Sequence, residues 1–257
     1  MPLNVIDHDG GIRMIVIDNP AKRNALDERM YRQLAALWKE LAQDPGCRAV
    51  ILTGAGGAFC SGADLAENLM ALPDVDTFVD EAFLKSAFFP KPIIAAIDGA
   101  CVAGGLELAL GCDVRLASTS ARIGLPEPRW GIFPSGGGAR KLADEIGYGR
   151  ATELLLTGRL IGAQEALALG LISEVVAPER LTERALAVAA QIAANSPAAC
   201  YAIKRYLHAA RAPSTALASL EDDLTAFARN ADLAEGVAAF LGKREPIYPP
   251  LDASRKI

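Results

Sequence analysis

The chain has 257 residues, of which 51% are hydrophobic and 22% are charged. This balance excludes intrinsic disorder and low-complexity repeats, and the length is enough to bury a large core. The 26 basic and 31 acidic residues give a net charge of −5 without a local basic cluster, so no nucleic-acid partner is expected. The five cysteines are odd in number and contain no C-x-x-C pair, which predicts free thiols in a reducing compartment.

Neither a targeting segment nor a membrane span is expected. The N-terminus carries acidic residues where a signal peptide has basic ones. The most apolar stretch, residues 92–112, is interrupted by Asp98, Glu107 and several glycines. It therefore falls short of the roughly 20 apolar residues that cross a bilayer. We expect a cytoplasmic protein.

The first half of the chain predicts an α/β core. Residues 3–17 are rich in β-branched side chains and broken at Asp9-Gly10-Gly11, which predicts a two-stranded hairpin. Apolar residues recur at helical spacing over residues 26–41 behind a candidate N-cap at Asp27, which predicts a helix. Buried strands are expected at residues 49–53, 93–97 and 114–117. The first two of these strands run into glycine-rich segments at residues 54–65 and 98–107.

The second half predicts a loop and then mostly helices. Proline and glycine are so frequent in residues 123–138 that we expect a shaped loop without regular structure. Helices follow from about Ala139, with a short strand at residues 171–176. From Pro178 onward the pattern is almost wholly helical, and its apolar stripes span residues 181–192, 217–227 and 233–240. The prediction is a core over residues 1–195 and a helical region over residues 196–257.

Two carboxylates are candidates for acid–base chemistry. Glu107 is the only charged residue in segment 99–112. If it is buried, its pKa would rise toward neutrality and it could act as an acid or base. The alternative is that Glu107 only complements the helix dipole from the first turn of a helix. Glu127 lies between two prolines and so has a stiff backbone; the alternative is a surface carboxylate paired with Arg122 or Arg129.

Backbone N–H groups of the two glycine-rich segments could bind an oxyanion. Gly104 and Gly105 precede Glu107, and Ser61 and Gly62 occupy the corresponding place in the first segment. One N–H group from each segment would polarise a carbonyl oxygen, although the glycines could serve only tight turns. Dinucleotide, P-loop and serine-hydrolase motifs are absent from the sequence, and no metal-ligand spacing occurs, so no metal is expected.

Five segments, in order over nearly the whole chain, resemble the enoyl-CoA hydratase/isomerase (crotonase) family. They are Asn19-Pro-Ala-Lys-Arg-Asn-Ala-Leu, Phe59-Cys-Ser-Gly-Ala-Asp-Leu, Lys91-Pro-Ile-Ile-Ala-Ala-Ile-Asp-Gly, Gly104-Gly-Leu-Glu-Leu-Ala and Gly158-Arg-Leu-Ile-Gly-Ala-Gln-Glu-Ala-Leu-Ala-Leu-Gly-Leu. The resemblance implies an α/β fold, a spiral of ββα units, followed by a helical oligomerisation region that forms homotrimers, often paired into hexamers.

The resemblance also implies a reaction on an acyl-CoA substrate. Two backbone N–H groups of the family hold the thioester oxygen, and the matching positions are Ser61 and Gly104. The two glutamates of family hydratases match Glu107, assigned to the water, and Glu127, assigned to the Cα proton. Coenzyme A is part of the substrate, and no separate cofactor is implied. The alternatives are isomerisation, hydrolysis or C–C cleavage on the same oxyanion hole, or a non-catalytic CoA-binding subunit.

Further residues are implied to contact the substrate. Basic side chains would meet the CoA phosphates, one of them from a neighbouring subunit, and their alternative is a solvated surface charge. The chain departs from the common family pattern at Pro128-Arg129-Trp130 and at Ser135, which argues against a simple short-chain acyl group. The expected substrate contacts are Lys22, Arg23, Gly62, Ala63, Asp64, Leu65, Trp130 and Lys243.

Overall fold

The computed structural model describes residues 2–67, 69, 72–211 and 233–247. The large sheet has strand order β1-β2-β3-β4-β6-β9, and a small sheet has order β5-β7-β8. In the large sheet, β1 and β2 are antiparallel and the other neighbours are parallel. The strands are β1 (Leu3–His8), β2 (Ile12–Ile17), β3 (Ala49–Gly54), β4 (Ile93–Ile97), β5 (Ala100–Val102), β6 (Val114–Ser118), β7 (Arg122–Gly124), β8 (Ile161–Gly162) and β9 (Glu174–Val176).

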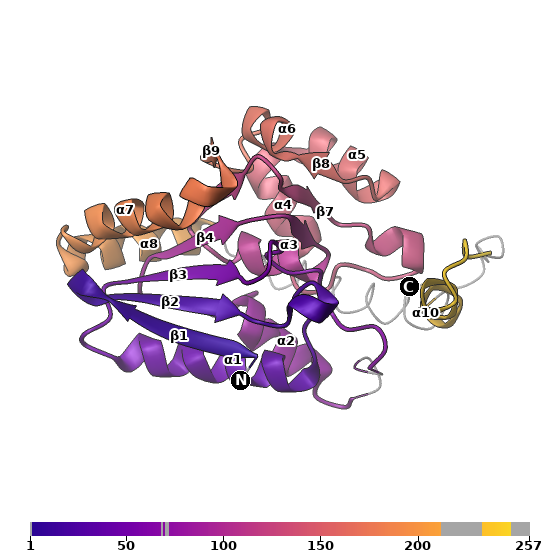
Figure 1. The fold of residues 1–257 in the computed structure, drawn as a ribbon, viewed down its shortest axis with the longest axis horizontal. Coiled ribbons are helices and arrows are strands. Elements are labelled where there is room, and N and C mark those ends of the chain that lie inside the picture. Colours follow the sequence, from indigo (N-terminus) through magenta and orange to yellow (C-terminus); the bar gives the residue numbers. More distant parts are fainter. Residues whose placement is uncertain (1, 68, 70–71, 212–232, 248–257) are drawn as a thin grey trace.

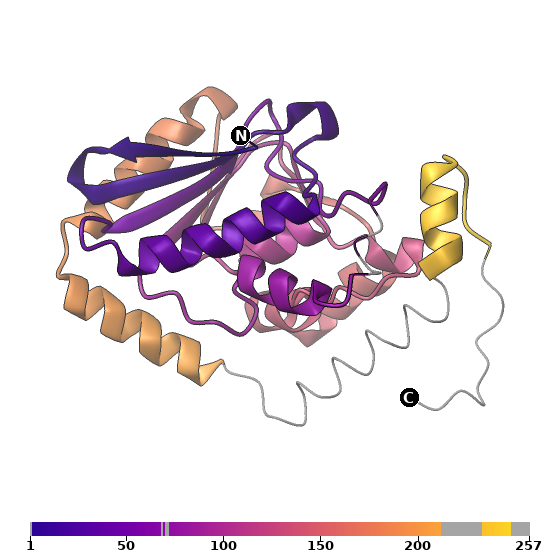
Figure 2. The ribbon, with the colours of Figure 1, turned by 90° about the horizontal axis from the view of Figure 1, so that it is seen from below.

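Helices cover both faces of the large sheet (Figure 1). Helices α1 and α2 lie together on one face, and Figure 2 shows α1 running across it. On the other face, Leu181, Ala185 and Ala189 of α7 pack into one apolar cluster with Ile51 and Ile94. The helices are α1 (Glu28–Gln43), α2 (Val75–Phe83), α3 (Gly104–Leu110), α4 (Gly138–Ile146), α5 (Tyr148–Thr157), α6 (Ala163–Ala168), α7 (Leu181–Ala193), α8 (Pro197–Ala210) and α10 (Leu233–Leu241).

Local sequence signals explain the N-terminal elements. The hairpin forms with Leu3 opposite Ile17, as expected. Helix α1 begins after Asp27, whose carboxylate accepts the Met30 N–H at 2.7 Å. Such a cap contributes about 1 kcal/mol. The expected strands at 49–53, 93–97 and 114–117 are confirmed as β3, β4 and β6.

Two ββα units build the site. The units β4–β5–α3 and β6–β7–α4 each place one strand in the large sheet and one in the small sheet. Cys60 forms a parallel bridge with Cys101, so the two glycine-rich segments lie side by side. The approach is so close that a Cβ on Gly105 would lie 2.2 Å from the Cys60 carbonyl oxygen. Only glycine therefore fits at the start of α3.

Two expectations for the middle of the chain were right only in part. Residues 123–138 are not entirely irregular, because β7 includes Ile123 and Gly124, and Glu127–Trp130 form a 3-10 helix. Pairing with β5 and β8 makes these two residues a strand despite their neighbouring prolines. The strand expected at 171–176 is confined to β9, because the ladder with β6 begins only at Glu174.

The C-terminal part bends away from the core after α7. The axes of residues 178–193 and 197–210 differ by 104°. Helix α10 lies at one end of the molecule, where Phe240 packs edge-on against Trp130 at 5.2 Å between ring centroids. A Cβ on Gly236 would lie 1.7 Å from the Trp130 carbonyl oxygen, so this helix needs glycine to dock. The stripe at 217–227 lies outside the described residues, and the boundary near residue 195 stays a prediction.

Two further features concern the whole described chain. All five cysteines are free, as expected. Within the described ranges no single helix is long and apolar enough to cross a membrane. The segments 178–193 and 197–210 reach that length and apolarity only when they are counted together, and a bend of 104° separates them.

Candidate active site

The structure brings the two candidate carboxylates into one buried region. Glu107 lies in α3, Glu127 begins the 3-10 helix, and each is 5% exposed. The Gly138 N–H donates to Oε1 of Glu107 at 3.0 Å and so fixes that carboxyl group. Oε2 of Glu127 is buried and has no hydrogen-bond partner among the described residues. A buried polar atom without a partner is rare, and it often marks a functional position.

The environment of Glu127 favours its protonated form. Burial raises the pKa of the Glu127 carboxyl well above its usual value, and the negative charge of Glu107 raises it further. Both effects disfavour a second negative charge in the same low-dielectric region. One proton shared unequally by two carboxyl groups is the arrangement that allows one to act as acid and the other as base.

The backbone at the start of α3 presents a free donor. Ala103 precedes the helix with φ 52° and ψ −129°, a conformation that strains an L-residue by about 1–3 kcal/mol. This turn leaves Gly104 as the first helical residue, whose N–H has no intrahelical acceptor. No described backbone carbonyl accepts it either. Strain stored next to an unpaired donor is typical of a functional turn.

The second donor differs from the one the resemblance implied. The Ser61 N–H donates to the Arg23 carbonyl at 3.1 Å, and the Ser61 hydroxyl donates to the Lys22 carbonyl at 3.1 Å. Ser61 therefore anchors the loop around residue 22 and is not a free donor, so the assignment of Ser61 to the oxyanion was wrong. Sequence position alone does not show which N–H a distant carbonyl engages.

Ala63 carries the unpaired N–H of the first glycine-rich segment. Ala63 pairs with Leu26 in an isolated parallel bridge, but the two hydrogen bonds of this bridge are made by the neighbours of Ala63. The Leu26 N–H donates to the Gly62 carbonyl, and the Asp64 N–H donates to the Leu26 carbonyl. No described backbone carbonyl accepts a hydrogen bond from the Ala63 N–H. The segment lies against α3, because a Cβ on Gly62 would be 3.1 Å from the Gly104 nitrogen. The free N–H groups of Ala63 and Gly104 thus belong to segments in direct contact.

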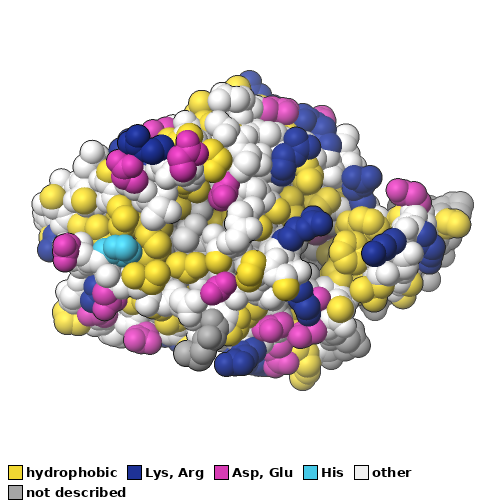
Figure 3. Space-filling model, in the orientation of Figure 1, with side chains coloured by type: hydrophobic (Ala, Val, Ile, Leu, Met, Phe, Trp, Pro, Cys, Tyr) yellow, Lys and Arg dark blue, Asp and Glu magenta, His cyan; other side chains and the backbone are white. Residues whose placement is uncertain are grey.

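The expected substrate contacts have different surroundings. Lys22 forms an ion pair with Asp64, a buried carboxylate, whereas the exposed Arg23 makes no ion pair within the described ranges. Leu65 follows in the same turn and is partly buried. Lys243 is exposed in the turn after α10. Figure 3 shows Lys and Arg side chains gathered on the side of the molecule next to α10. Trp130 is partly buried against α10.

Sequence reasoning missed three aromatic residues beside this site. Tyr31, Phe78 and Phe83 are at most 3% exposed and form a cluster with ring centroids 5.3–5.6 Å apart. Phe83 reaches the site, because a Cβ on Gly104 would lie 3.0 Å from its ring and one on Gly136 would lie 2.5 Å from it. The only sequence signal was that Tyr31 and Phe78 fall at buried positions of amphipathic helices, which equally indicates ordinary core packing.

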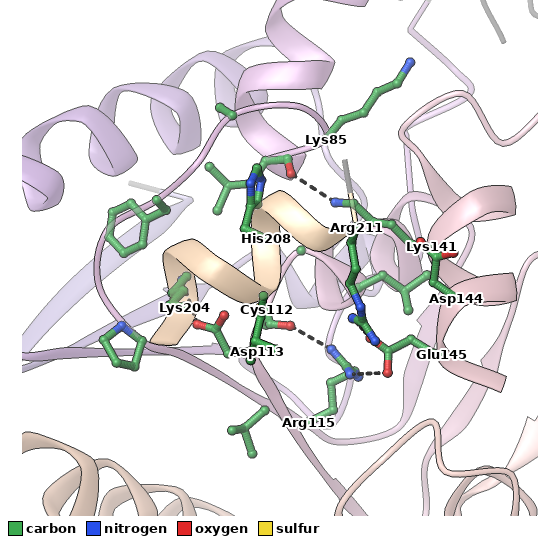
Figure 4. Close-up of a pocket in the computed structure, with 18 of the residues that line it drawn as sticks. Lys85, Cys112, Asp113, Arg115, Lys141, Asp144, Glu145, Lys204, His208 and Arg211 are labelled. Carbon is green, nitrogen blue, oxygen red and sulfur yellow. Dashed lines mark hydrogen bonds and ion pairs between the residues drawn. The ribbon is translucent and has the colours of Figure 1, made fainter. Parts of the chain in front are cut away.

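A separate hollow of about 600 Å³ lies beneath α8 (Figure 4). Two ion pairs of its lining residues are Lys204 with Asp113 at 2.7 Å and Arg211 with Glu145 at 2.9 Å. Burial lowers the pKa of Lys141 to about 8, with a further lowering by Arg140. Neither candidate glutamate lines this hollow, so it is distinct from the carboxylate site. Among the described residues no group of three or more His, Cys, Asp or Glu side chains could hold a metal ion.

Comparisons with known proteins cover almost the whole chain. The family model described as "Enoyl-CoA hydratase/isomerase" matches residues 7–249. The enoyl-CoA hydratase EchA19 of Mycobacterium tuberculosis is 37% identical over 96% of both chains. The 2,3-dehydroadipyl-CoA hydratase of Escherichia coli is 35% identical over 95% of this chain and 97% of that protein. A solved carnitinyl-CoA hydratase of Mycobacterium avium superposes with a TM-score of 0.88 and 32% identity, over 97% and 99% of the two chains. The structural similarity confirms the expected fold class.

Proposed function

Because this chain belongs to the enoyl-CoA hydratase/isomerase family, we propose that it adds water across the α,β double bond of an enoyl-CoA thioester. One observation carries the proposal: two buried carboxyl groups, one with an unpartnered oxygen, share a site that also contains the unpaired Gly104 N–H. An isomerase needs one acid–base group, whereas hydration needs one group for the water and another for Cα.

The electrostatics divide these roles. The raised pKa of Glu127 makes it the group that holds a proton and delivers it to Cα. Glu107, held by the Gly138 N–H, takes a proton from the water as its oxygen bonds to Cβ. The electron pair of the double bond passes to the thioester as an enolate, and the N–H groups of Ala63 and Gly104 stabilise its oxygen. The proton then returns from Glu107 to Glu127 by exchange with solvent.

The surroundings support an acyl-CoA as the substrate and a homotrimer or hexamer as the assembly. Arg23 and the cations near α10 would contact the CoA phosphates, with Lys243 contributing from a neighbouring subunit. No residue of α8 is buried, and its apolar side chains are exposed, with Ile203 at 62% and Tyr206 at 75%. A helix with uncovered apolar side chains favours association with other copies.

The test is turnover of crotonyl-CoA, and then of a panel of longer and aromatic enoyl-CoA esters, followed as loss of the conjugated thioester absorbance, in the wild type, Glu107→Gln and Glu127→Gln. Each change should lower kcat by about 10²–10⁴ with little effect on CoA-ester affinity, because each removes one proton-transfer group. The double variant should lose much less than the product of the two factors. Glu153→Gln, an exposed carboxylate paired with Arg159, is the matched control and should turn over normally. Normal turnover in Glu107→Gln would exclude hydration and favour isomerisation.

A further inference from the structure

The Tyr31 side chain reaches from α1 to the start of α3. Its ring is 3% exposed and is held between Phe78 and Phe83, with centroid distances of 5.6 and 5.3 Å. Two aromatic neighbours fix the plane of a buried ring, so the direction of its hydroxyl is fixed as well.

The hydroxyl lies beside the free donor of α3. A Cβ on Gly104 would be 3.4 Å from the Tyr31 oxygen. Because Cα–Cβ bonds tilt toward the N-terminus of a helix, this contact places the phenol near the end of α3 that presents the Gly104 N–H. Phe83 approaches the same glycine, to within 3.0 Å, so the cluster forms one wall of the site.

No side-chain hydrogen bond among the described residues involves this hydroxyl, and it is not one of the fully buried atoms without a partner, so it remains accessible from the site. Oε2 of Glu127 does not engage it, because that oxygen is itself without a hydrogen-bond partner among the described residues. The Tyr31 hydroxyl and Oε2 of Glu127 are therefore both available to a ligand in the site.

The charge state of Tyr31 suits a donor. Burial raises the pKa of the Tyr31 phenol well above its usual value, and negative charge on Cys60, Glu107 or Glu127 raises it further. The phenol thus keeps its proton at neutral pH and can donate to an oxygen without transferring that proton.

We propose that the Tyr31 hydroxyl donates a third hydrogen bond to the thioester oxygen as it becomes an enolate, alongside the N–H groups of Ala63 and Gly104. The inference rests on the proposed acyl-CoA chemistry of the site. No covalent bond to Tyr31 forms or breaks, and its contribution grows as negative charge develops on the oxygen.

The test uses Tyr31→Phe, which keeps the ring and removes only the hydroxyl, in two reactions. One is hydration of crotonyl-CoA, and the other is exchange of the α-proton of butyryl-CoA with deuterated water, which forms the enolate without adding water. Both rates should fall by about 10²-fold with KM nearly unchanged, the usual effect of losing one oxyanion donor. Tyr148→Phe, at an 81% exposed position, is the matched control and should leave both rates unchanged.

Stability separates this role from a structural one. Because the hydroxyl has no internal partner, Tyr31→Phe should melt at the wild-type temperature or above it. A lower melting temperature, or failure to fold, would show that the hydroxyl bonds within the protein and would overturn the proposal. So would normal rates in both reactions. Loss of hydration with normal exchange would assign Tyr31 to the water instead of the enolate, which also overturns it.

Failure of the proposed function gives a different pattern. If the wild-type protein exchanges the α-proton but hydrates no enoyl-CoA, hydration is excluded and the exchange rate of Tyr31→Phe still decides the role of the hydroxyl. If the wild-type protein performs neither reaction with these four-carbon esters or with longer and aromatic CoA esters, the acyl-CoA site itself is refuted, and the role of Tyr31 with it.

Discussion

Gly136→Ala should displace the Glu107 carboxyl group while leaving the fold intact. Gly136 is buried next to the site, and a Cβ there would lie 2.5 Å from Cδ2 of Phe83 and 2.7 Å from Oε2 of Glu107. Ordinary contacts begin near 3.4 Å, so the ring would have to retreat by about 0.9 Å and the carboxyl group by about 0.7 Å. Phe83 is 1% exposed and is packed against Tyr31, so the carboxyl group has to yield.

The expected cost follows from this displacement. Overpacking by one methyl group in a filled site should lower the free energy of unfolding by about 1–3 kcal/mol. A misplacement of about 1 Å in a proton-transfer group should lower kcat by about 10²-fold. The affinity for a saturated CoA ester should change little, because the methyl group meets the carboxyl group and the ring and not the loop at residues 22–23, which we propose contacts CoA.

The assay combines steady-state hydration of crotonyl-CoA with urea unfolding. Gly149→Ala is the matched control, because a Cβ there meets nothing within 4 Å and the residue lies in α5. That change should raise the free energy of unfolding by about 0.4–1 kcal/mol and leave kcat unchanged. Wild-type kcat in a folded Gly136→Ala protein would refute the placement of Glu107 in the reaction.

Two further predictions concern stability and assembly. The folded-state pKa of Glu127 is raised, so its contribution to stability is complete below the unfolded pKa near 4.5 and is lost as pH rises through the folded value. The free energy of unfolding of Glu127→Gln should therefore rise relative to that of the wild type as pH increases from 5 to 8, by at most about 1.4 kcal/mol for each pH unit. Urea unfolding of both proteins across this range measures the difference, and a difference that does not change with pH would contradict the prediction. Replacing Ile203 and Tyr206 of α8 with glutamate should convert a trimeric or hexameric mass to a monomeric one in light scattering, and a monomeric wild type would refute the assembly.

Local patterns in the sequence determined most of the secondary structure. The hairpin at residues 3–17, the Asp27 cap and the three buried strands are each specified by neighbours within a few positions of the chain. Periodicity and capping act at that range, so they can be read without knowing the fold. The isolation of Glu107 in an apolar segment likewise indicated a buried carboxylate, and the structure confirms its burial.

Contacts between distant segments decided the details of the site. Whether Ser61 or Ala63 carries the free N–H depends on a carbonyl of the loop at residue 23, and no local pattern specifies that contact. Tyr31 looks like an ordinary core residue until the tertiary structure brings its hydroxyl beside Gly104 of α3. Oxyanion donors and proton-transfer groups are defined by which hydrogen bonds remain unmade, and only the assembled tertiary structure determines that.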